Sequence, residues 1–404
     1  MKKSEILTTA VASVMSLAML VGCGEGAATT TETSSDATAA TATEASAPAG
    51  PTFKIGAIGP LTGGAAAYGN AVCNAAELAV AEINANGGIN GYQVEYSKED
   101  DELNAEKSVN AYNTLKDWGM QLLVGSTTSA CSIAVSEYTK ADNMFQLTPS
   151  GSAEDCVKYD NAFRVCFSDP NQGIASAQYI SDHNLATKVG IIYDSSDVYS
   201  SGIYQKFTEE ADGKNFEIVS AEAFTQDNNT DFSVQLQKAK DAGADLVFLP
   251  IYYKDASLIL TQANTMGYKP TFFGVDGLDG ILTVDNFDTA LAEGVMLLTP
   301  FAADATDDLT VKFVSQYKEK YGEVPNQFAA DAYDAVYIIK QAIEAKNVTP
   351  DMSVSDICEA VKGAMTEIEA AGLTSAKMTW DANGEPNKEP KAVVIKDGAY
   401  VSAQ

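Results

Sequence analysis

Short apolar runs alternate along the chain with longer stretches in which apolar residues recur at helical spacing. In the first half, runs typical of strands fall at 54–58, 92–96, 121–124 and 144–147, and helical stretches separate the strands. The first of these helices ends before the glycine pair at 87–88, a common helix stop. Strand and helix in this order predict a parallel, doubly wound α/β sheet with crossovers on both faces.

The same order begins again in the second half of the chain. After a short run at 163–166, the pattern predicts strands at 188–193, 216–223, 245–249 and 271–275, with helices at about 171–183, 199–212, 230–241 and 254–266. A chain of this length exceeds one typical domain. We therefore expect two lobes, each built on its own doubly wound parallel sheet.

The pattern changes after residue 298. Helical stretches at roughly 306–321, 326–345 and 353–371 precede strands at 374–380 and near 392–395. We predict an N-terminal lobe of residues 52–168 plus 300–392 and a C-terminal lobe of residues 169–299 plus 393–404. The chain then crosses between the lobes near Ser168, Thr299 and Val393, and these crossings form a three-strand hinge.

Two loops rich in hydroxyl groups follow neighbouring strands of the first half. The first holds Ser126, Thr127, Thr128 and Ser129, and Ser129 is a suitable N-cap for the helix that follows. The second holds Ser150 and Ser152. Free N–H groups at a helix start, with hydroxyl donors beside them, can hold a small anion such as a carboxylate. The alternative is a solvated loop with an ordinary cap.

Polar and aromatic residues occupy corresponding positions in both halves, after the first, third and fourth strands. They are Tyr68, Ser129, Ser150 and Ser152 in the first half and Tyr199, Tyr252 and Asp276 in the second. Ligands of open parallel sheets bind outside the carboxyl ends of the strands, so we expect these residues to face one cleft. Each tyrosine could equally be a core residue with a hydrated hydroxyl group.

Asp276 ends a buried strand, where an acid without a partner would be costly. A ligand ammonium group would supply that partner. The alternative is that N–H groups of the local turn satisfy the carboxylate.

The N-terminus has the pattern of a secretion signal. Two lysines precede an apolar run at 11–21, which is too short to span a bilayer and ends in Leu20-Val21-Gly22-Cys23. This ending resembles the bacterial lipobox, in which the signal peptide, here residues 1–22, is cut off and the cysteine, here Cys23, is lipidated. The alternative is an internal cysteine in an ordinary secretion signal. Residues 23–51, rich in Ala, Thr and Ser, are predicted to form a flexible tether.

Charge and composition exclude several functions. Removing residues 1–22 takes away two lysines and one glutamate, which changes the formal net charge from −29 to −30. So acidic a protein repels nucleic acid and anionic membrane surfaces. The single histidine and the lack of a CxxC pair argue against a zinc site, and we expect no metal and no cofactor. Neither a GxSxG elbow nor a GxGxxG loop occurs, so we expect no enzyme.

The cysteines leave alternatives open. Cys156 and Cys166 lie on either side of a predicted turn and could form a disulfide. Cys73 and Cys131 could meet if their helices are neighbours, although buried free thiols are equally compatible with their positions and with that of Cys358.

Six motifs resemble one family when they are taken in order. They are IGAIGPLTGGAAAYG at 55–69, INANGGINGYQVE at 83–95, VGSTTS at 124–129, TPSGS at 148–152, FFGVDG at 272–277 and WDANGEP at 380–386. Together they resemble the substrate-binding proteins of branched-chain amino acid ABC transporters, the leucine/isoleucine/valine-binding family, over residues 53–398. The resemblance implies a type I periplasmic-binding-protein fold.

The resemblance also implies roles for the cleft residues. Ser129 matches the serine whose hydroxyl holds the ligand carboxylate, and Ser152 matches the threonine in the loop after the fourth strand. Ser150 falls where a backbone carbonyl meets the ligand ammonium. Asp276 matches the acid that pairs with the ammonium, one methylene shorter than the family's usual glutamate. Tyr68, Tyr199 and Tyr252 match aromatic residues of the cleft.

The expected function is therefore that of a solute-binding lipoprotein. It would be a monomer anchored outside the cytoplasm through Cys23 and would deliver an amino acid, with a branched-chain side chain expected, to ABC permease subunits. The alternatives are a ligand-sensing receptor module, or a binding protein for another small polar solute such as an amide or an aromatic acid.

Overall fold

A computed structural model of the protein describes residues 50–403. The first sheet is entirely parallel and has the order β2-β1-β3-β4-β5. Its strands are β1 (Phe53–Gly59), β2 (Val94–Asp100), β3 (Leu122–Val124), β4 (Phe145–Thr148) and β5 (Ala162–Arg164). The helices between them are α1 (Ala66–Ala85), α2 (Ala105–Trp118) and α3 (Ser129–Asp142).

The second sheet has the order β12-β11-β10-β9-β8-β6-β7. Its strands are β6 (Lys188–Asp194), β7 (Glu217–Phe224), β8 (Leu246–Leu249), β9 (Thr271–Gly274), β10 (Met296–Thr299), β11 (Lys391–Lys396) and β12 (Ala399–Ser402). The helices are α4 (Asp169–Asp182), α5 (Val198–Glu210), α6 (Ser233–Asp241) and α7 (Tyr253–Thr265). The pairs β10–β11 and β11–β12 are antiparallel, and the remaining pairs are parallel.

Both sheets share one order in their parallel part, because β7-β6-β8-β9-β10 repeats β2-β1-β3-β4-β5. The predicted fold class, with two doubly wound lobes, is confirmed. We call the part built on β1–β5 the first lobe and the part built on β6–β12 the second lobe. In each lobe the strand order reverses between the first and third strands, which opens a crevice at the carboxyl ends of the strands.

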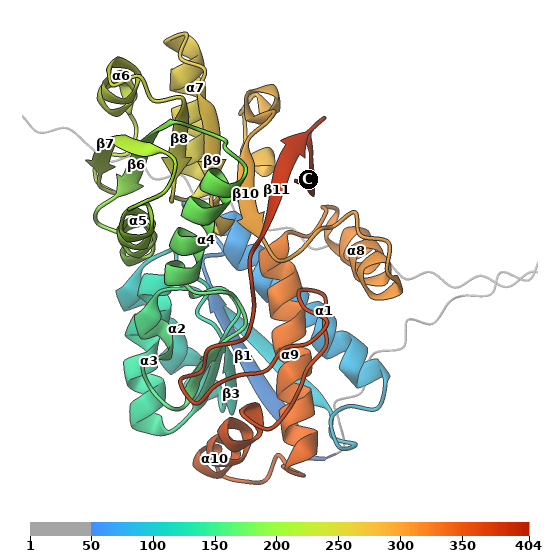
Figure 1. Ribbon diagram of the computed structural model, residues 1–404. Coiled ribbons are helices and arrows are strands. Elements are labelled where there is room, and N and C mark those ends of the chain that lie inside the picture. The colour runs from blue at the N-terminus through green and yellow to red at the C-terminus, as the bar shows by residue number, and fades with distance from the viewer. Residues whose placement is uncertain (1–49, 404) are drawn as a thin grey trace, which may run out of the picture. The chain divides into compact units, whose positions relative to one another are not determined.

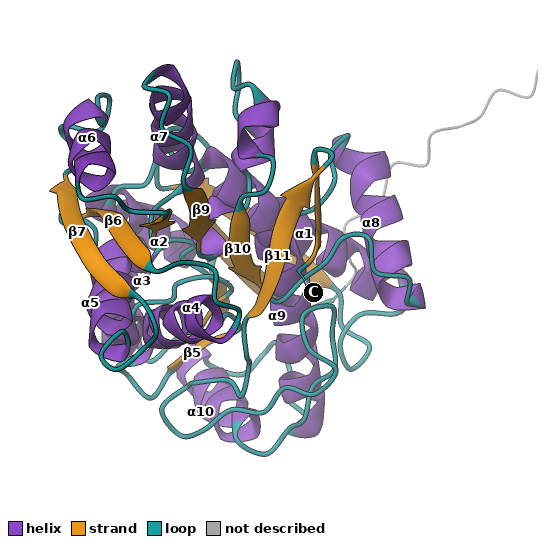
Figure 2. Cartoon of the chain, turned by 45° about the horizontal axis from the view of Figure 1, so that its top comes forward, coloured by secondary structure: helices purple, strands orange, loops and turns teal. Residues whose placement is uncertain are grey.

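The C-terminal third of the chain returns to the first lobe before it closes the second sheet. Helices α8 (Asp308–Tyr321), α9 (Gln327–Ala345) and α10 (Val354–Met365) follow β10, and α9 lies along α1 (Figure 1). Small side chains on both helices, including Ala75 and Ala335, are fully buried and allow this close approach. The chain therefore passes between the sheets after β5, after β10 and before β11. The exact residues at which one lobe ends and the other begins stay predictions. Figure 2 shows β11 beside β10.

Two expectations for this region are wrong. The predicted strand at 374–380 is absent as a strand, since Met378 and Trp380 form only isolated bridges with Ala370 and Pro386. The predicted helix at 353–371 ends at Met365. The carboxylate of Asp334 accepts bonds from the N–H groups at 373 and 374, so side chains satisfy this backbone in place of a sheet. The strand β12 was not anticipated.

The possible disulfide between Cys156 and Cys166 is also contradicted, because both are buried free thiols. Cys156 lies in a short 3-10 helix, Glu154–Val157, and its Sγ donates to the carbonyl of Ser129 at 3.6 Å. The sulfur is thus directed at α3 and not at a second sulfur. Cys73, Cys131 and Cys358 are buried free thiols as well. Within residues 50–403, no helix combines the length and the apolar character needed to cross a membrane.

A buried ion pair joins α9 to the segment that leads into the last crossing. Lys388 Nζ lies 2.5 Å from Asp331 Oδ1, and the two side chains are 1% and 2% exposed. Burial raises the pKa of Asp331 from 3.8 to about 6, although Lys388 opposes this change. The ammonium group therefore favours the charged carboxylate against the cost of its burial.

We predict that Lys388→Met lowers the free energy of unfolding by about 3–5 kcal/mol at pH 8, because it leaves a buried charge unpaired. Without Lys388 the folded-state pKa of Asp331 rises further above its unfolded value, so this loss should grow as the pH rises through the folded-state pKa and shrink at pH 5. Urea unfolding at both pH values measures it.

The double variant Asp331→Asn/Lys388→Met should recover most of the loss. A matched surface variant, Lys377→Met, breaks a pair whose side chains are 65% and 56% exposed and should change stability by at most about 0.5 kcal/mol. A loss in Lys388→Met that is equal at both pH values would contradict the prediction.

Candidate ligand-binding site

Two pockets have lining residues from both lobes, and one of them lies beyond the carboxyl ends of strands from both sheets. It is lined by Tyr68, Thr127, Thr128, Ser129, Ser150 and Phe328 from the first lobe and by Tyr199, Tyr252, Asp276 and Gly277 from the second. The volume of this cavity is about 10 Å³, which is just enough for one water molecule. The lobes are therefore closed on each other, and a solute of amino-acid size can enter only when they separate.

The structure brings six of the seven predicted residues to this pocket. Ser152 is the exception: it is 1% exposed but does not line the pocket. Thr127, Thr128, Gly277 and Phe328 were missed. Thr127 and Thr128 belong to the same hydroxyl run as Ser129 and could have been included on that ground.

The wall from the first lobe is made by the loops after β3 and β4, which bind each other. The hydroxyl of Ser129 accepts hydrogen bonds from the N–H groups of Ser152 and Ala153, both at 3.2 Å. The hydroxyl of Ser150 donates to the carbonyl of Thr127 at 2.6 Å. These bonds leave the hydroxyl proton of Ser129 free to donate to a ligand, because its oxygen already serves as acceptor for the loop.

The expectation that Ser129 caps the following helix is wrong. Thr128 occupies the N-cap position of α3, its side chain makes no capping bond, and Ser129 is the first helical residue. The hydroxyl of Thr128 is buried in the pocket wall without a hydrogen-bond partner. Two hydroxyl donors therefore lie at the start of a helix, an arrangement that favours an anion.

The wall from the second lobe carries a buried carboxylate. Asp276 follows β9 and is 3% exposed, and the hydroxyl of Tyr199 donates to its Oδ1 at 2.6 Å. Its backbone N–H donates to Oε1 of Gln172 on α4 at 3.1 Å. Burial raises the pKa of Asp276 from 3.8 to about 7, while the Tyr199 hydrogen bond lowers it. A carboxylate in this state gains from a cationic partner.

Aromatic rings from both lobes close the pocket between these two walls. The ring of Tyr68, on α1, lies 5.4 Å from that of Tyr252 and 4.4 Å from that of Phe328, measured between centroids. Tyr252 stacks on Tyr199 at 5.0 Å. The hydroxyl of Tyr68 is fully buried, where it donates to the carbonyl of Gly277 and accepts from the N–H of Tyr253 at 3.2 Å. The tyrosines therefore line the pocket and also connect the lobes.

The sequence matches a family profile described as "Periplasmic binding protein" over residues 52–399. It is 30% identical to Leu/Ile/Val-binding protein homolog 3 of Brucella melitensis, with 81% of this chain and 91% of that protein covered. It is 29% identical to Leu/Ile/Val-binding protein BraC3 of Rhizobium johnstonii, with 82% and 88% covered.

Solved structures agree with these relatives. The crystal structure of the branched-chain amino acid transporter substrate binding protein LivJ from Streptococcus pneumoniae, in complex with isoleucine, has a TM-score of 0.79 at 28% identity, with 87% of this chain and 99% of that chain covered. The resemblance that the six motifs carry, and the fold that it implies, are confirmed. The chain belongs to the periplasmic binding protein family, among the Leu/Ile/Val-binding proteins.

Proposed function

We propose that the protein binds an amino acid with a branched apolar side chain between its two lobes and presents it to an ABC permease, without converting it. The observation that carries this proposal is the distribution of charge across one pocket. Hydroxyl donors at a helix start face it from the first lobe, and a buried carboxylate faces it from the second. An amino acid zwitterion carries the two complementary charges.

The residues take separate roles in this proposal. The hydroxyls of Ser129 and Thr128 donate to the ligand carboxylate. Asp276 accepts from the ligand ammonium, with the backbone carbonyl of Ser150 as a second acceptor. Tyr68 and Phe328 offer apolar surface to the side chain, which suits a branched aliphatic group. Ser152 supports the site through its backbone, because its N–H group donates to Ser129.

Closure of the lobes is the mechanism that follows. A ligand held by Ser129 on one lobe and Asp276 on the other has its full set of contacts only in the closed form, so binding shifts the population toward that form. The closed form also makes protein contacts across the cleft, such as that from Tyr68 to Gly277. We propose that the permease recognises the closed form.

Thermal-shift screening of the purified protein against the common amino acids tests this function, followed by calorimetry on each amino acid that stabilises it. A ligand at 100 times its Kd adds about 2.7 kcal/mol to stability, which is readily measured. Stabilisation by leucine, isoleucine or valine supports the proposal. A screen in which no amino acid stabilises the protein contradicts it.

We predict that Asp276→Ala weakens binding of the best amino acid by about 2–5 kcal/mol, because it leaves the ligand ammonium unpaired in a closed cleft. Titration calorimetry measures the change. Asp255→Ala is a matched control, since Asp255 is buried in the same lobe with a pKa raised to about 7 and lines a different pocket. Equal losses in the two variants would remove Asp276 from its proposed role.

The affinity should also depend on pH. The ligand ammonium binds the ionised form of Asp276, whose pKa of about 7 is raised mainly by burial and further by the negative charge of Asp331 on α9. Binding therefore releases a proton below pH 7, and affinity should fall by up to about tenfold for each pH unit below that value. Calorimetry between pH 8 and pH 5.5 measures this. Asp276→Asn should bind weakly and without this dependence.

We further propose that residues 1–22 are a signal peptide and that Cys23 carries a lipid, with residues 23–51 as the tether. Residues 1–49 lie outside the part of the chain that the structure describes. The motif that ends in Cys23 supports the proposal, as does the extracytoplasmic setting in which periplasmic binding proteins act.

We predict that Cys23→Ser moves the protein from the detergent phase to the aqueous phase in Triton X-114 partitioning, because the variant has no thiol to carry the lipid. The intact mass of the wild-type protein should exceed that of the chain starting at Cys23 by the mass of the lipid. Wild-type protein that stays in the aqueous phase would rule out the anchor.

A further inference from the structure

Arg164 is the only arginine in the chain, in which every other basic residue except the histidine is a lysine. Its side chain is fully buried at the end of β5. Lysine presents its donors from a single point, whereas the guanidinium group presents five donors in a fixed planar fork. The one position that uses arginine is therefore a position where the direction of several hydrogen bonds matters.

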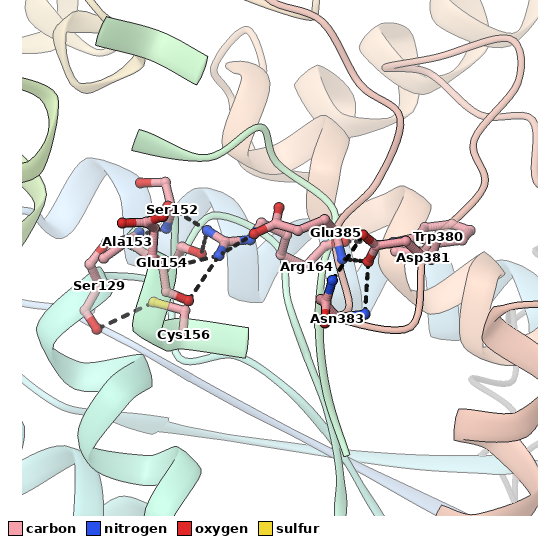
Figure 3. Close-up of polar contacts among 11 residues, drawn as sticks. Ser129, Ser152, Ala153, Glu154, Cys156, Arg164, Trp380, Asp381, Asn383 and Glu385 are labelled. Carbon is pink, nitrogen blue, oxygen red and sulfur yellow. Dashed lines mark hydrogen bonds and ion pairs between the residues drawn. The ribbon is translucent and has the colours of Figure 1, made fainter. Parts of the chain in front are cut away.

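The guanidinium group binds four successive carbonyls of the loop after β4 (Figure 3). Nη1 donates to the carbonyls of Gly151, at 3.1 Å, and of Ser152. Nη2 donates to those of Ala153, at 3.0 Å, and Glu154, at 3.4 Å. Loop residues 151–154 are thus held along their carbonyl side by a single side chain.

The N–H side of the same loop holds the proposed ligand residue. The N–H groups of Ser152 and Ala153 both donate to the hydroxyl oxygen of Ser129. With both bonds made, the hydroxyl proton of Ser129 must point elsewhere, and Ser129 lines the pocket. Arg164 and Ser129 thus bind opposite sides of the same loop, and Arg164 does not line the pocket.

Arg164 is itself fixed by the segment that leads to the last crossing between the lobes. Oε1 of Glu385 lies 2.9 Å from Nη2. The backbone N–H of Arg164 donates to the carbonyl of Gly384 at 3.1 Å, and the indole N–H of Trp380 donates to the Arg164 carbonyl at 2.7 Å (Figure 3). Gly384 has φ +80°, and a Cβ there would lie 2.4 Å from the Ala162 carbonyl oxygen, so only glycine fits this contact.

The loop is also bound from the second lobe. The carbonyl of Ser152, which accepts from Arg164, accepts from the N–H of Asp169 at 2.9 Å as well. Asp169 begins α4, the first helix after the first crossing, and Gln172 in the same helix accepts from the N–H of Asp276. One short chain of contacts therefore joins the two walls of the pocket to the crossing segments.

We propose that Arg164, held by Glu385, is a positioning residue for the ligand carboxylate: it orients loop 151–154 so that the Ser129 hydroxyl points into the pocket. This inference rests on the proposed function, since it assigns Arg164 to the carboxylate end of an amino acid. It adds a residue that the ligand does not touch and that connects the carboxylate wall to the hinge segments.

The test compares Arg164→Lys and Glu385→Gln with Gln121→Ala in the purified full-length protein. Gln121 is 9% exposed and makes two hydrogen bonds, one partly buried and one buried, beside β3 at the amino-terminal edge of the same sheet, away from the pocket. Gln121→Ala therefore serves as a control: it destabilises the first lobe without touching the pocket or the Arg164 contacts. Two ligands are titrated into each variant: leucine, and leucinamide, which lacks the carboxylate.

For Arg164→Lys we expect at least a tenfold loss of affinity for leucine and less than a threefold loss for leucinamide. For Glu385→Gln, which retains the guanidinium fork but removes its anionic partner, we expect a smaller loss with the same selectivity. This second variant keeps the test decisive if Arg164→Lys fails to fold. Gln121→Ala should lower the melting temperature with no change in either affinity. Parallel losses for both ligands, or affinity for leucine equal to that of the wild type in a folded variant, would overturn the proposal.

Hydrogen exchange of the ligand-free proteins separates this inference from the proposed function. The amides of residues 152 and 153 should exchange at least tenfold faster in Arg164→Lys than in the wild type or in Gln121→Ala. If the wild type binds neither leucine, isoleucine nor valine while this exchange is still accelerated, the proposed function fails and the role of Arg164 in orienting the loop stands. Unchanged exchange refutes that role, whatever the ligand.

Discussion

A buried carboxylate must be compensated, and Asp276 imposes this constraint on the whole cleft. It follows β9, a central strand of the second sheet, is 3% exposed and has a pKa raised to about 7. The neighbouring groups meet the constraint only in part, with one hydrogen bond from Tyr199 to the side chain. A cationic group of a ligand would stabilise the ionised carboxylate further. In the proposed function, Asp276 holds the ammonium end of a zwitterion and the first lobe holds the carboxylate end.

The sheet order explains why both walls can meet at one place. Crossovers leave on opposite faces after the first and third strands, so the loops after these strands diverge and leave a crevice. The first lobe fills the edge of its crevice with the hydroxyl loop before α3, and the second lobe fills its own with Tyr199 and Tyr252. Duplicating one order in both lobes places two such crevices where they can face each other when the hinge closes.

Most of this arrangement could be predicted from the sequence, because it depends on periodicity and on residues that follow strands. Tyr199 and Asp276 were found in this way, 77 residues apart in the chain and in contact in the structure. Phe328 could not be found, since it enters the pocket from α9, which returns from the C-terminal third to lie along α1. Only the packing of α9 against α1 shows that Phe328 lies beside the pocket.

Both errors come from reading a local pattern without distant contacts. The segment at 374–380 reads as a strand because its pattern suits pairing with another strand. Ser129 reads as a helix cap because a serine before a helix is expected to bind the N–H groups of that same helix. In the structure, Asp334 binds the backbone before this segment, and the Ser129 hydroxyl binds the N–H groups of a different loop. Side chains that replace regular backbone pairing leave no periodic signal.

The buried ion pairs show why these irregular contacts gather at the crossings. Among the ion pairs within residues 50–403, only those of Arg164 and Lys388 have cationic side chains that are at most 1% exposed. Each pair has one member in the same segment, since Glu385, the partner of Arg164, lies three residues before Lys388. A hinge must allow the lobes to rotate while the chain on either side of the bend stays fixed to its lobe. A buried, hydrogen-bonded pair does this well, because separating its charges is far more costly than bending the few backbone dihedrals beside it. The two pairs thus fix the chain just before its last crossing, and Arg164 extends that fixed region to the loop beside the pocket.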